Sequence, residues 1–262
     1  MSEPSDSNWK EPRKGATAEE VLQNLDLTGK FALITGANRG IGLCAAKSLA
    51  KHNCEVTIAC RDLTVGEETK KDILLEHPDA RVHLVVLNLL ELSSVEKCAK
   101  DYLDSGRPLH YLILNAGVWA PVASHSSDGF ESTFQTNHLA HFHLSLLLKE
   151  KLVESRPARV VLVSSRIQNT WVRGLSADSV DWKLLSPPAN SLNRPIYMYA
   201  LSKMCNAAFA TSLNDLLEDK GVKVTSKSRP CAAAENAEIR EKLWRISQEM
   251  LDNYKGNNIK NS

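Results

Sequence analysis

The segment that most constrains the fold is a short apolar run that is followed at once by glycines. Residues 31–35 read FALIT, and TGANRGIG at 35–42 places glycines at positions 36, 40 and 42. Beyond residue 42 the apolar positions recur at helical spacing. A strand, a glycine-rich turn and a helix, in this order, let the backbone approach a phosphate group at the helix amino end. A tight turn without a ligand is the alternative, but the flanking strand and helix favour phosphate binding.

Further apolar runs and helical patterns alternate along the chain. The runs that we predict to be strands are 55–60, 81–89, 109–115, 159–165 and 221–226. The helical patterns are 66–77, 93–103, 130–152 and 196–219. Near-continuous apolar strands between helices are typical of a parallel sheet covered on both faces. We therefore expect an α/β fold with a doubly wound parallel sheet of the Rossmann type, in one domain.

Composition narrows the class of protein. The 262 residues carry a formal net charge of +1, which argues against a nucleic-acid binder. No apolar run reaches the roughly 18 residues of a membrane span, and the polar start does not resemble a secretory signal. The six cysteines are scattered without a CxxC pair, which favours reduced thiols and a cytoplasmic protein. Residues 1–25, rich in Ser, Pro, Glu and Lys near their start, are expected to be a disordered leader.

The charges near the glycine-rich turn bear on the cofactor. An acid after the second strand suits the ribose of NAD, whereas an arginine suits the 2′-phosphate of NADP. Here Arg61 follows that strand, with Asp62 next to it, and Arg39 lies inside the turn. Two solvated arginines without a ligand are the alternative. The pattern predicts that NADP(H) is favoured over NAD(H).

Tyr199 and Lys203 stand four residues apart in the helical pattern 196–219, so they share one helix face. An ammonium beside a phenol favours the phenolate, which makes the tyrosine a usable acid and base. An exposed pair on an amphipathic helix is the alternative. Tyr197 has leucine rather than lysine at the corresponding position, so we interpret it as a packing residue or a substrate contact.

Together these motifs resemble the short-chain dehydrogenase/reductase family. TGANRGIG at 35–42, NAG at 115–117, Asn137, the serine pair 164–165 and YxxxK at 199–203 occur in the family's order over about residues 26–226. ACRD at 59–62, the long insert before Tyr199 and KLWxxS near the end resemble the branch of retinol dehydrogenases and WW-domain oxidoreductases.

The resemblance implies an oxidoreductase that transfers a hydride between NADP(H) and an apolar alcohol or carbonyl compound, steroid- or retinoid-like. Tyr199 would transfer the proton, and Lys203 would favour the phenolate form of Tyr199 and hold the nicotinamide ribose. Ser165 would bind the substrate oxygen, and Asn137 would hold a relay water. Ser164 is the alternative to Ser165. The implied cofactor-binding residues are Gly36, Asn38, Arg39, Gly40, Ile41, Gly42, Arg61, Asn88, Asn115, Ala116, Gly117, Tyr199 and Lys203. Asn88 replaces the aspartate that the family usually has there.

The carboxy-terminal part departs from the family. After the sixth strand we expect a Pro-Gly turn, a substrate lid and further elements, but Pro230 is followed by Cys231 and then by a helical pattern at 232–251. We interpret residues 26–226 as a dinucleotide-binding catalytic domain and 227–262 as a shortened segment with one helix. A catalytically impaired cofactor-binding protein that acts through association is therefore the alternative function. The resemblance also implies a possible homodimer through helices 130–152 and 196–219.

His138, His141 and His143 suggest a metal cluster, but no carboxylate or cysteine completes it and the family uses no catalytic metal. We therefore expect no metal.

Overall fold

The computed structural model describes residues 15–119, 124–186 and 194–261. Its centre is a six-stranded parallel sheet with the strand order β3-β2-β1-β4-β5-β6. The strands are β1 (Phe31–Thr35), β2 (Glu55–Cys60), β3 (Val82–Val86), β4 (Tyr111–Leu114), β5 (Ala158–Leu162) and β6 (Val222–Ser226). The order reverses direction between β1 and β4, so the predicted doubly wound sheet is confirmed, and the crevice at this switch point is where such folds bind ligands.

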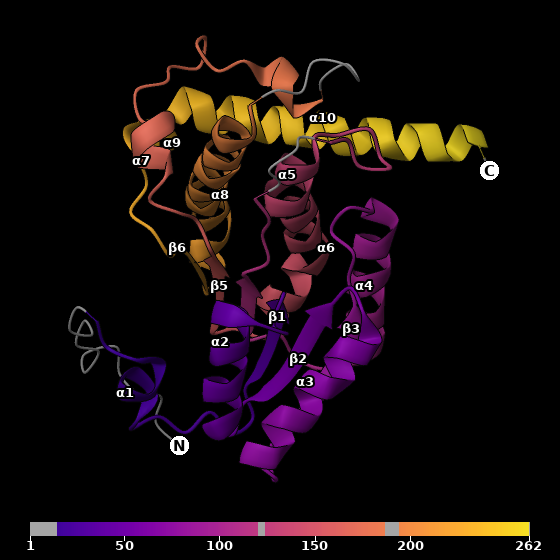
Figure 1. Ribbon diagram of the computed structural model, residues 1–262, viewed down its shortest axis with the longest axis vertical. Helices are drawn as coiled ribbons and strands as arrows, with labels where there is room; N and C mark the ends of the chain where they lie inside the picture. Colours follow the sequence, from indigo (N-terminus) through magenta and orange to yellow (C-terminus); the bar gives the residue numbers. More distant parts are fainter. Residues whose placement is uncertain (1–14, 120–123, 187–193, 262) are drawn as a thin grey trace.

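Helices flank the sheet and cross its carboxyl end (Figure 1). The longer ones are α2 (Gly40–Lys51), α3 (Leu63–Glu76), α4 (Leu92–Asp104), α6 (Ala140–Glu154), α8 (Pro195–Leu217) and α10 (Ala237–Asn261). The short ones are α1 (Ala18–Leu22), α5 (Ser132–Phe134), η2 (Gln135–Leu139), α7 (Gln168–Trp171), η3 (Trp182–Leu185), η4 (Glu218–Lys220) and α9 (Ala232–Glu235).

Alternate residues of the strands pack into different cores. Ala32 and Ile34 belong to a cluster with residues of α2 and α3, whereas Leu33 between them belongs to a larger cluster with α4, α6 and α8. All three strand residues are fully buried. Because successive strand side chains point to opposite faces, both faces of β1 are dry, and this explains its unbroken apolar sequence.

The expectation that helices cover both faces of the whole sheet is wrong for one corner. Paired residues in neighbouring strands share a face, and the row Ile34, Ile113, Val161, Thr225 crosses the sheet on the α2 face. Along this row, burial falls from complete at Ile34 to partial at Ile113 and Val161, and Thr225 is exposed. No described helix covers this face of β5 and β6.

The predicted helix over residues 130–152 is interrupted. Its first part is α5, its middle is the π-helix η2 and its last part is α6. The backbone N–H of Ala140 donates to the carbonyl of Gln135, five residues back. The wider turn places Asn137 in the middle of the π-helix, and π-turns of this kind occur frequently at functional sites.

The carboxy-terminal pattern predicted as one helix over 232–251 forms α9 and the longer α10. Trp244 of α10 lies 5.1 Å from the ring of Phe142 in α6 and 5.9 Å from that of Phe209 in α8, between ring centroids. Figure 1 shows α10 lying across both helices. It therefore covers part of the helix pair through which a homodimer was expected, and the homodimer stays a prediction.

The expected disordered leader differs in part from the structure. Residues 1–14 lie outside the described residues. Thr17 caps α1 by accepting from the N–H of Glu20 at 3.2 Å, while the Glu20 carboxylate accepts from the N–H of Thr17 at 2.7 Å. This reciprocal capping box gives Ala18–Leu22 a helical start that composition alone does not reveal. Within the described chain, no helix combines the length and the apolar character needed to cross a membrane.

Candidate active site

The glycine-rich turn and the end of β4 are packed against each other. A Cβ added at Gly42 would lie 2.5 Å from both the Asn115 side-chain nitrogen and the Gly36 carbonyl oxygen. The same Asn115 amide donates to the carbonyl oxygens of Thr35 at 3.0 Å and Gly36 at 3.2 Å. Gly42 therefore has to be a glycine, and Asn115 supports the turn from the neighbouring strand.

The amino end of α2 is open to an anion. Its N-cap residue, Arg39, makes no capping hydrogen bond with its side chain and is exposed. Gly40 has φ +57°, and a Cβ built there would meet nothing within 4 Å. Ile41 is 58% exposed. The first two residues of this 12-residue helix are thus exposed, which fits the pyrophosphate of a dinucleotide.

The residues after β2 and β3 flank this opening. Arg61 is exposed, and no ion pair to it is found among the described residues. Asp62 has a structural role, since its carboxylate accepts from the N–H of Thr64 at 2.8 Å and caps α3. The Asp62 carboxylate is therefore engaged at the start of α3. Asn88 donates to Glu91 at 2.8 Å and accepts from the N–H of Leu90 at 3.2 Å.

Lys203 is the most strongly buried cation of the predicted site, with 3% exposure. Its Nζ donates to the carbonyl oxygen of Val163 at 2.9 Å and lies 5.8 Å from the centre of the Tyr199 ring. Burial lowers the pKa of the ammonium to about 8. The predicted pair is therefore brought together, with Tyr199 partly exposed one turn before a largely dehydrated lysine.

Asn137 connects three segments around this lysine. Its side-chain oxygen accepts from the N–H of Val118 at 2.8 Å, and its nitrogen donates to the Val118 carbonyl at 2.9 Å and to the Ser202 hydroxyl at 3.0 Å. A Cβ at Gly117 would lie 3.0 Å from Lys203 Nζ and 3.2 Å from Asn137 Oδ1. The NAG segment, the π-helix and α8 thus converge at one point.

The two serines after β5 differ in their surroundings. Ser164 is buried; its hydroxyl donates to the backbone carbonyl of Lys203 at 2.6 Å and accepts from Gln168 at 3.1 Å. Ser165 is partly exposed, and its hydroxyl accepts only weakly from the N–H of Ile167 at 3.4 Å. Ser164 therefore fixes the strand end to α8, and Ser165 has a proton to offer.

The profile of the short chain dehydrogenase family matches residues 30–177. The chain belongs to this family. A WW domain-containing oxidoreductase of Gallus gallus is 42% identical over 207 residues, 79% of this chain and 50% of that protein. Retinol dehydrogenase 11 of Mus musculus is 42% identical over 153 residues, 58% of this chain and 48% of that protein.

The resemblance seen in the motifs is thereby confirmed, and the chain spans about half the length of the curated relatives it matches. Among solved structures, an uncharacterised protein from Mycobacterium Paratuberculosis has a TM-score of 0.66 and 29% identity. That match covers 88% of this chain and 80% of the other.

The three histidines of η2 and α6 have separate hydrogen-bond partners. His138 contacts Asn206 and Ser247, both at 3.3 Å, and His143 contacts Glu96 at 3.2 Å. His141 contacts Thr35 and the carbonyl of Asn137. In the described ranges no three His, Cys, Asp or Glu residues gather as metal ligands would.

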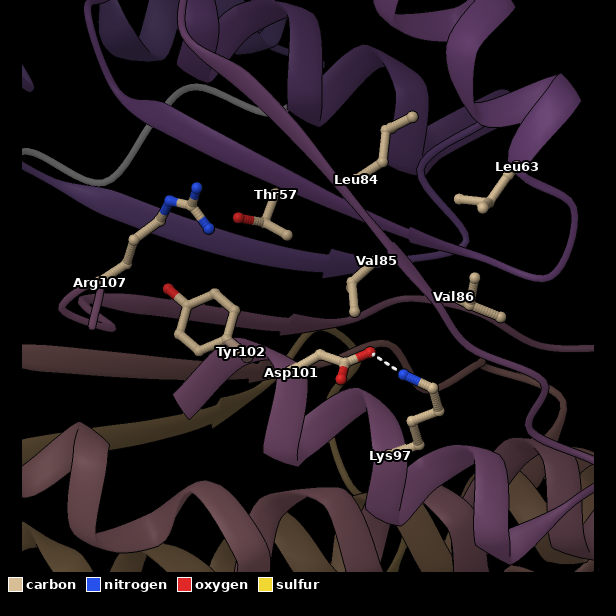
Figure 2. Close-up of a pocket in the computed structure, with 9 residues that line it drawn as sticks. All are labelled: Thr57, Leu63, Leu84, Val85, Val86, Lys97, Asp101, Tyr102 and Arg107. Atoms are coloured by element: carbon tan, nitrogen blue, oxygen red, sulfur yellow. Dashed lines mark hydrogen bonds and ion pairs between the residues drawn. The ribbon is translucent and has the colours of Figure 1, made fainter. Parts of the chain in front are cut away.

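A cavity of ≈ 320 Å³ lies at the β3 edge of the sheet, away from the residues of the predicted site (Figure 2). Lys97 and Asp101 of α4 pair across one side of it at 2.6 Å. Leu63 and Val86, 47% and 36% exposed, form part of its lining. None of the residues named for the cofactor or the chemistry lines it.

Several residues that organise the site were not predicted. Val163 contributes a carbonyl to Lys203, and Ser202 contributes a hydroxyl to Asn137. A backbone carbonyl leaves no signal in a sequence. Thr35 accepts from the N–H groups of both Asn115 and Ala116 at 3.0 Å. Thr35 could have been found, because it is the threonine that opens TGANRGIG.

Proposed function

We propose that the chain is an oxidoreductase that uses NADP(H) to interconvert an apolar alcohol and its carbonyl compound. The observation that carries this proposal is the buried ammonium of Lys203 beside the partly exposed phenol of Tyr199. A bound nicotinamide would supply the redox chemistry. The protein's part is to position the substrate oxygen and to move one proton.

In this proposal each side chain has one task at the substrate oxygen. Tyr199 gives its proton to that oxygen in reduction and takes it back in oxidation. Lys203 favours the phenolate, because a positive charge in a dry site is stabilised by a nearby negative one. Ser165 donates its hydroxyl proton to the substrate oxygen as negative charge develops there. Asn137 holds the Val118 backbone beside Lys203.

The cofactor-binding residues support a dinucleotide. The open amino end of α2 suits the pyrophosphate, and Asn115 with Ala116 and Gly117 would line the nicotinamide side. Exposed Arg39 and Arg61 suit the additional phosphate of NADP(H), which favours it over NAD(H). Asn88 would contact the adenine after releasing Glu91.

Exposed apolar side chains next to the site support an apolar substrate. Val118 and Trp119, 39% and 60% exposed, follow the NAG segment, and Ile196, 37% exposed, lies one turn before Tyr199. Retinol is named in the mouse relative. A retinoid- or steroid-like alcohol or carbonyl compound is therefore the proposed substrate class.

The test uses the full chain with NADPH as the probe. We expect NADPH fluorescence to change on binding and a panel of retinoid and steroid carbonyls to be turned over. Tyr199→Phe should bind NADPH within about three-fold of the parent and lose at least a hundred-fold in turnover, the usual effect of removing a general acid. Tyr111→Phe, at the amino end of β4, is the matched control. No NADPH binding, or a Tyr199→Phe variant as fast as the parent, would overturn the proposal.

A second function is favoured by the short connection that follows β6. β6 follows β5 as the last strand, and α9 begins after only the five residues 227–231. We propose that a lid-bearing segment is absent between β6 and α9, so that 26–226 forms the catalytic domain and 227–262 a shortened end. An impaired chain that binds NADPH and acts through association would then bind without turnover, and sedimentation of the complex would show its partner.

A further inference from the structure

A hydrogen-bonded chain of buried groups links the glycine-rich turn to the π-helix. The Thr35 hydroxyl accepts from the N–H groups of Asn115 and Ala116, both at 3.0 Å, and lies 3.0 Å from Nε2 of His141. Nδ1 of His141 lies 3.0 Å from the backbone carbonyl of Asn137. Both Thr35 and His141 are fully buried.

The partners determine which nitrogen carries the proton. A carbonyl can only accept, so Nδ1 of His141 must donate to Asn137. The Thr35 hydroxyl uses its two lone pairs for Asn115 and Ala116, so its proton points to Nε2 of His141, which accepts it. Every donor and acceptor in this series of hydrogen bonds is then satisfied with a neutral imidazole. Burial lowers the pKa of His141 to about 4, in agreement with that form.

Both ends of this chain reach groups that surround Lys203. At one end, Thr35 holds the backbone of Asn115 and Ala116, which leads into Gly117 against Lys203 Nζ. At the other end, His141 holds the backbone of Asn137, whose side chain clamps Val118. The imidazole thus spans the gap between two of the segments that surround the lysine.

We propose that His141 is a positioning residue: as a neutral Nδ1–H imidazole it fixes the distance between the NAG segment and the Asn137 turn, and so the placement of Lys203 beside Tyr199. It acts through other residues and touches neither substrate nor cofactor. This inference rests on the proposed function for its effect on turnover, but the arrangement of protons and backbone can be tested without any activity.

The first test is the tautomer. In the full chain labelled with 15N-histidine, we expect one imidazole with protonated Nδ1 and bare Nε2 at every pH from 5.5 to 9, and its signals should vanish in His141→Gln. An Nε2–H tautomer, or a His141 ring that titrates within this range, would overturn the proposal. The readout is independent of NADPH and of turnover.

The second test separates the two bonds. Asparagine at 141 can reach the Asn137 carbonyl but not Thr35, and glutamine can accept from Thr35 but not donate to Asn137. Amide exchange at Asn115 and Ala116 should speed up about ten-fold in His141→Phe and His141→Asn but little in His141→Gln. His143→Phe, a buried histidine two residues on that contacts Glu96 instead, is the matched control. Equal exchange in all variants would contradict the proposal.

The third readout is turnover. If the parent is active, His141→Phe should lower kcat about ten-fold with a KM within about two-fold, because a displaced lysine affects the proton step more than substrate capture. Both single-bond variants should recover part of kcat, and His143→Phe should match the parent. If the parent binds no NADPH, the proposed function fails while the tautomer and exchange results still decide the role of His141.

Discussion

The ammonium of Lys203 donates to the carbonyl oxygen of Val163, the last residue before the serine pair, across 2.9 Å. At the same strand end, the Ser164 hydroxyl donates to the backbone carbonyl of Lys203 at 2.6 Å. The end of β5 therefore holds the lysine at both its side chain and its main chain.

Removing the Lys203 charge should stabilise the fold. With a pKa lowered to about 8 against 10.5 for a free lysine, the ammonium costs the folded state about 3 kcal/mol at pH 7. Loss of the bond to Val163 offsets about 1 kcal/mol of this. The free energy of unfolding of Lys203→Met, measured in urea at pH 7, should therefore be about 2 kcal/mol higher than that of the parent. The variant should be inactive.

The pH dependence of that difference has a definite sign. Between pH 8 and 10.5 the unfolded parent binds more protons at Lys203 than the folded parent, so rising pH stabilises the parent. The advantage of Lys203→Met should shrink over this range. A stability difference between the two proteins that is constant from pH 7 to 10.5 would show that burial does not lower the pKa of Lys203. Urea titrations of both proteins at four pH values provide the measurement.

The two adjacent serines should separate stability from chemistry. Ser164→Ala removes one buried hydrogen bond from the Gln168 amide, which keeps its bond to Ser228, and one from the Lys203 carbonyl, so we expect about 1–2 kcal/mol of destabilisation. Ser165→Ala removes a donor to the substrate oxygen, so we expect about a hundred-fold loss of kcat with unchanged urea stability. Thermal or urea unfolding and single-turnover rates compare the two. A reversal of this pattern would assign the substrate contact to Ser164.

A side chain at Gly117 should impair catalysis more than stability. A Cβ there would lie 3.0 Å from Lys203 Nζ and 3.2 Å from Asn137 Oδ1, so the lysine has to move. Because the end of a lysine is flexible, stability should fall by less than about 1 kcal/mol, while kcat falls about ten-fold or more. Gly174→Ala, where a Cβ meets nothing within 4 Å, is the control. A Gly117→Ala variant with parental kcat would mean that the lysine position is not critical.

The parts of this fold that the sequence predicts are those that depend on local periodicity. The six apolar runs became the six strands, because residues such as Leu33 and Ile34 must be apolar when both faces are dry. Tyr199 and Lys203 were placed together because four residues make about one helical turn. The helical pattern that ends at residue 219 is followed by Gly221, which takes the left-handed conformation with φ 79° after the short η4 turn.

What the sequence did not predict depends on contacts between distant segments. His138 and His141 lie three residues apart, yet their partners come from α8 and α10 in one case and β1 in the other. The π-turn at Gln135–Leu139 is a change in hydrogen bonding that leaves the apolar spacing almost unaltered. The exposure of Thr225 depends on which described helices cover the α2 face, and strand patterns do not record that.

Arg61 should determine the cofactor preference. Its guanidinium is exposed at the end of β2, and Asp62 beside it is engaged in capping α3, so the charge is available to the 2′-phosphate of NADPH. A charge-assisted contact of this kind contributes about 1.5–3 kcal/mol, so Arg61→Ala should weaken NADPH binding at least about ten-fold and leave NADH binding unchanged. Titration of cofactor fluorescence at low and high salt measures the affinities for NADPH and NADH. The difference in NADPH affinity between the parent and Arg61→Ala should narrow as salt screens the exposed charge. Arg173→Ala, an exposed arginine far along the chain from the glycine-rich turn, controls for the loss of one positive charge. Equal weakening of NADPH and NADH by Arg61→Ala would place the arginine at the pyrophosphate, which both cofactors share, and would end the assignment of NADP(H) from this residue.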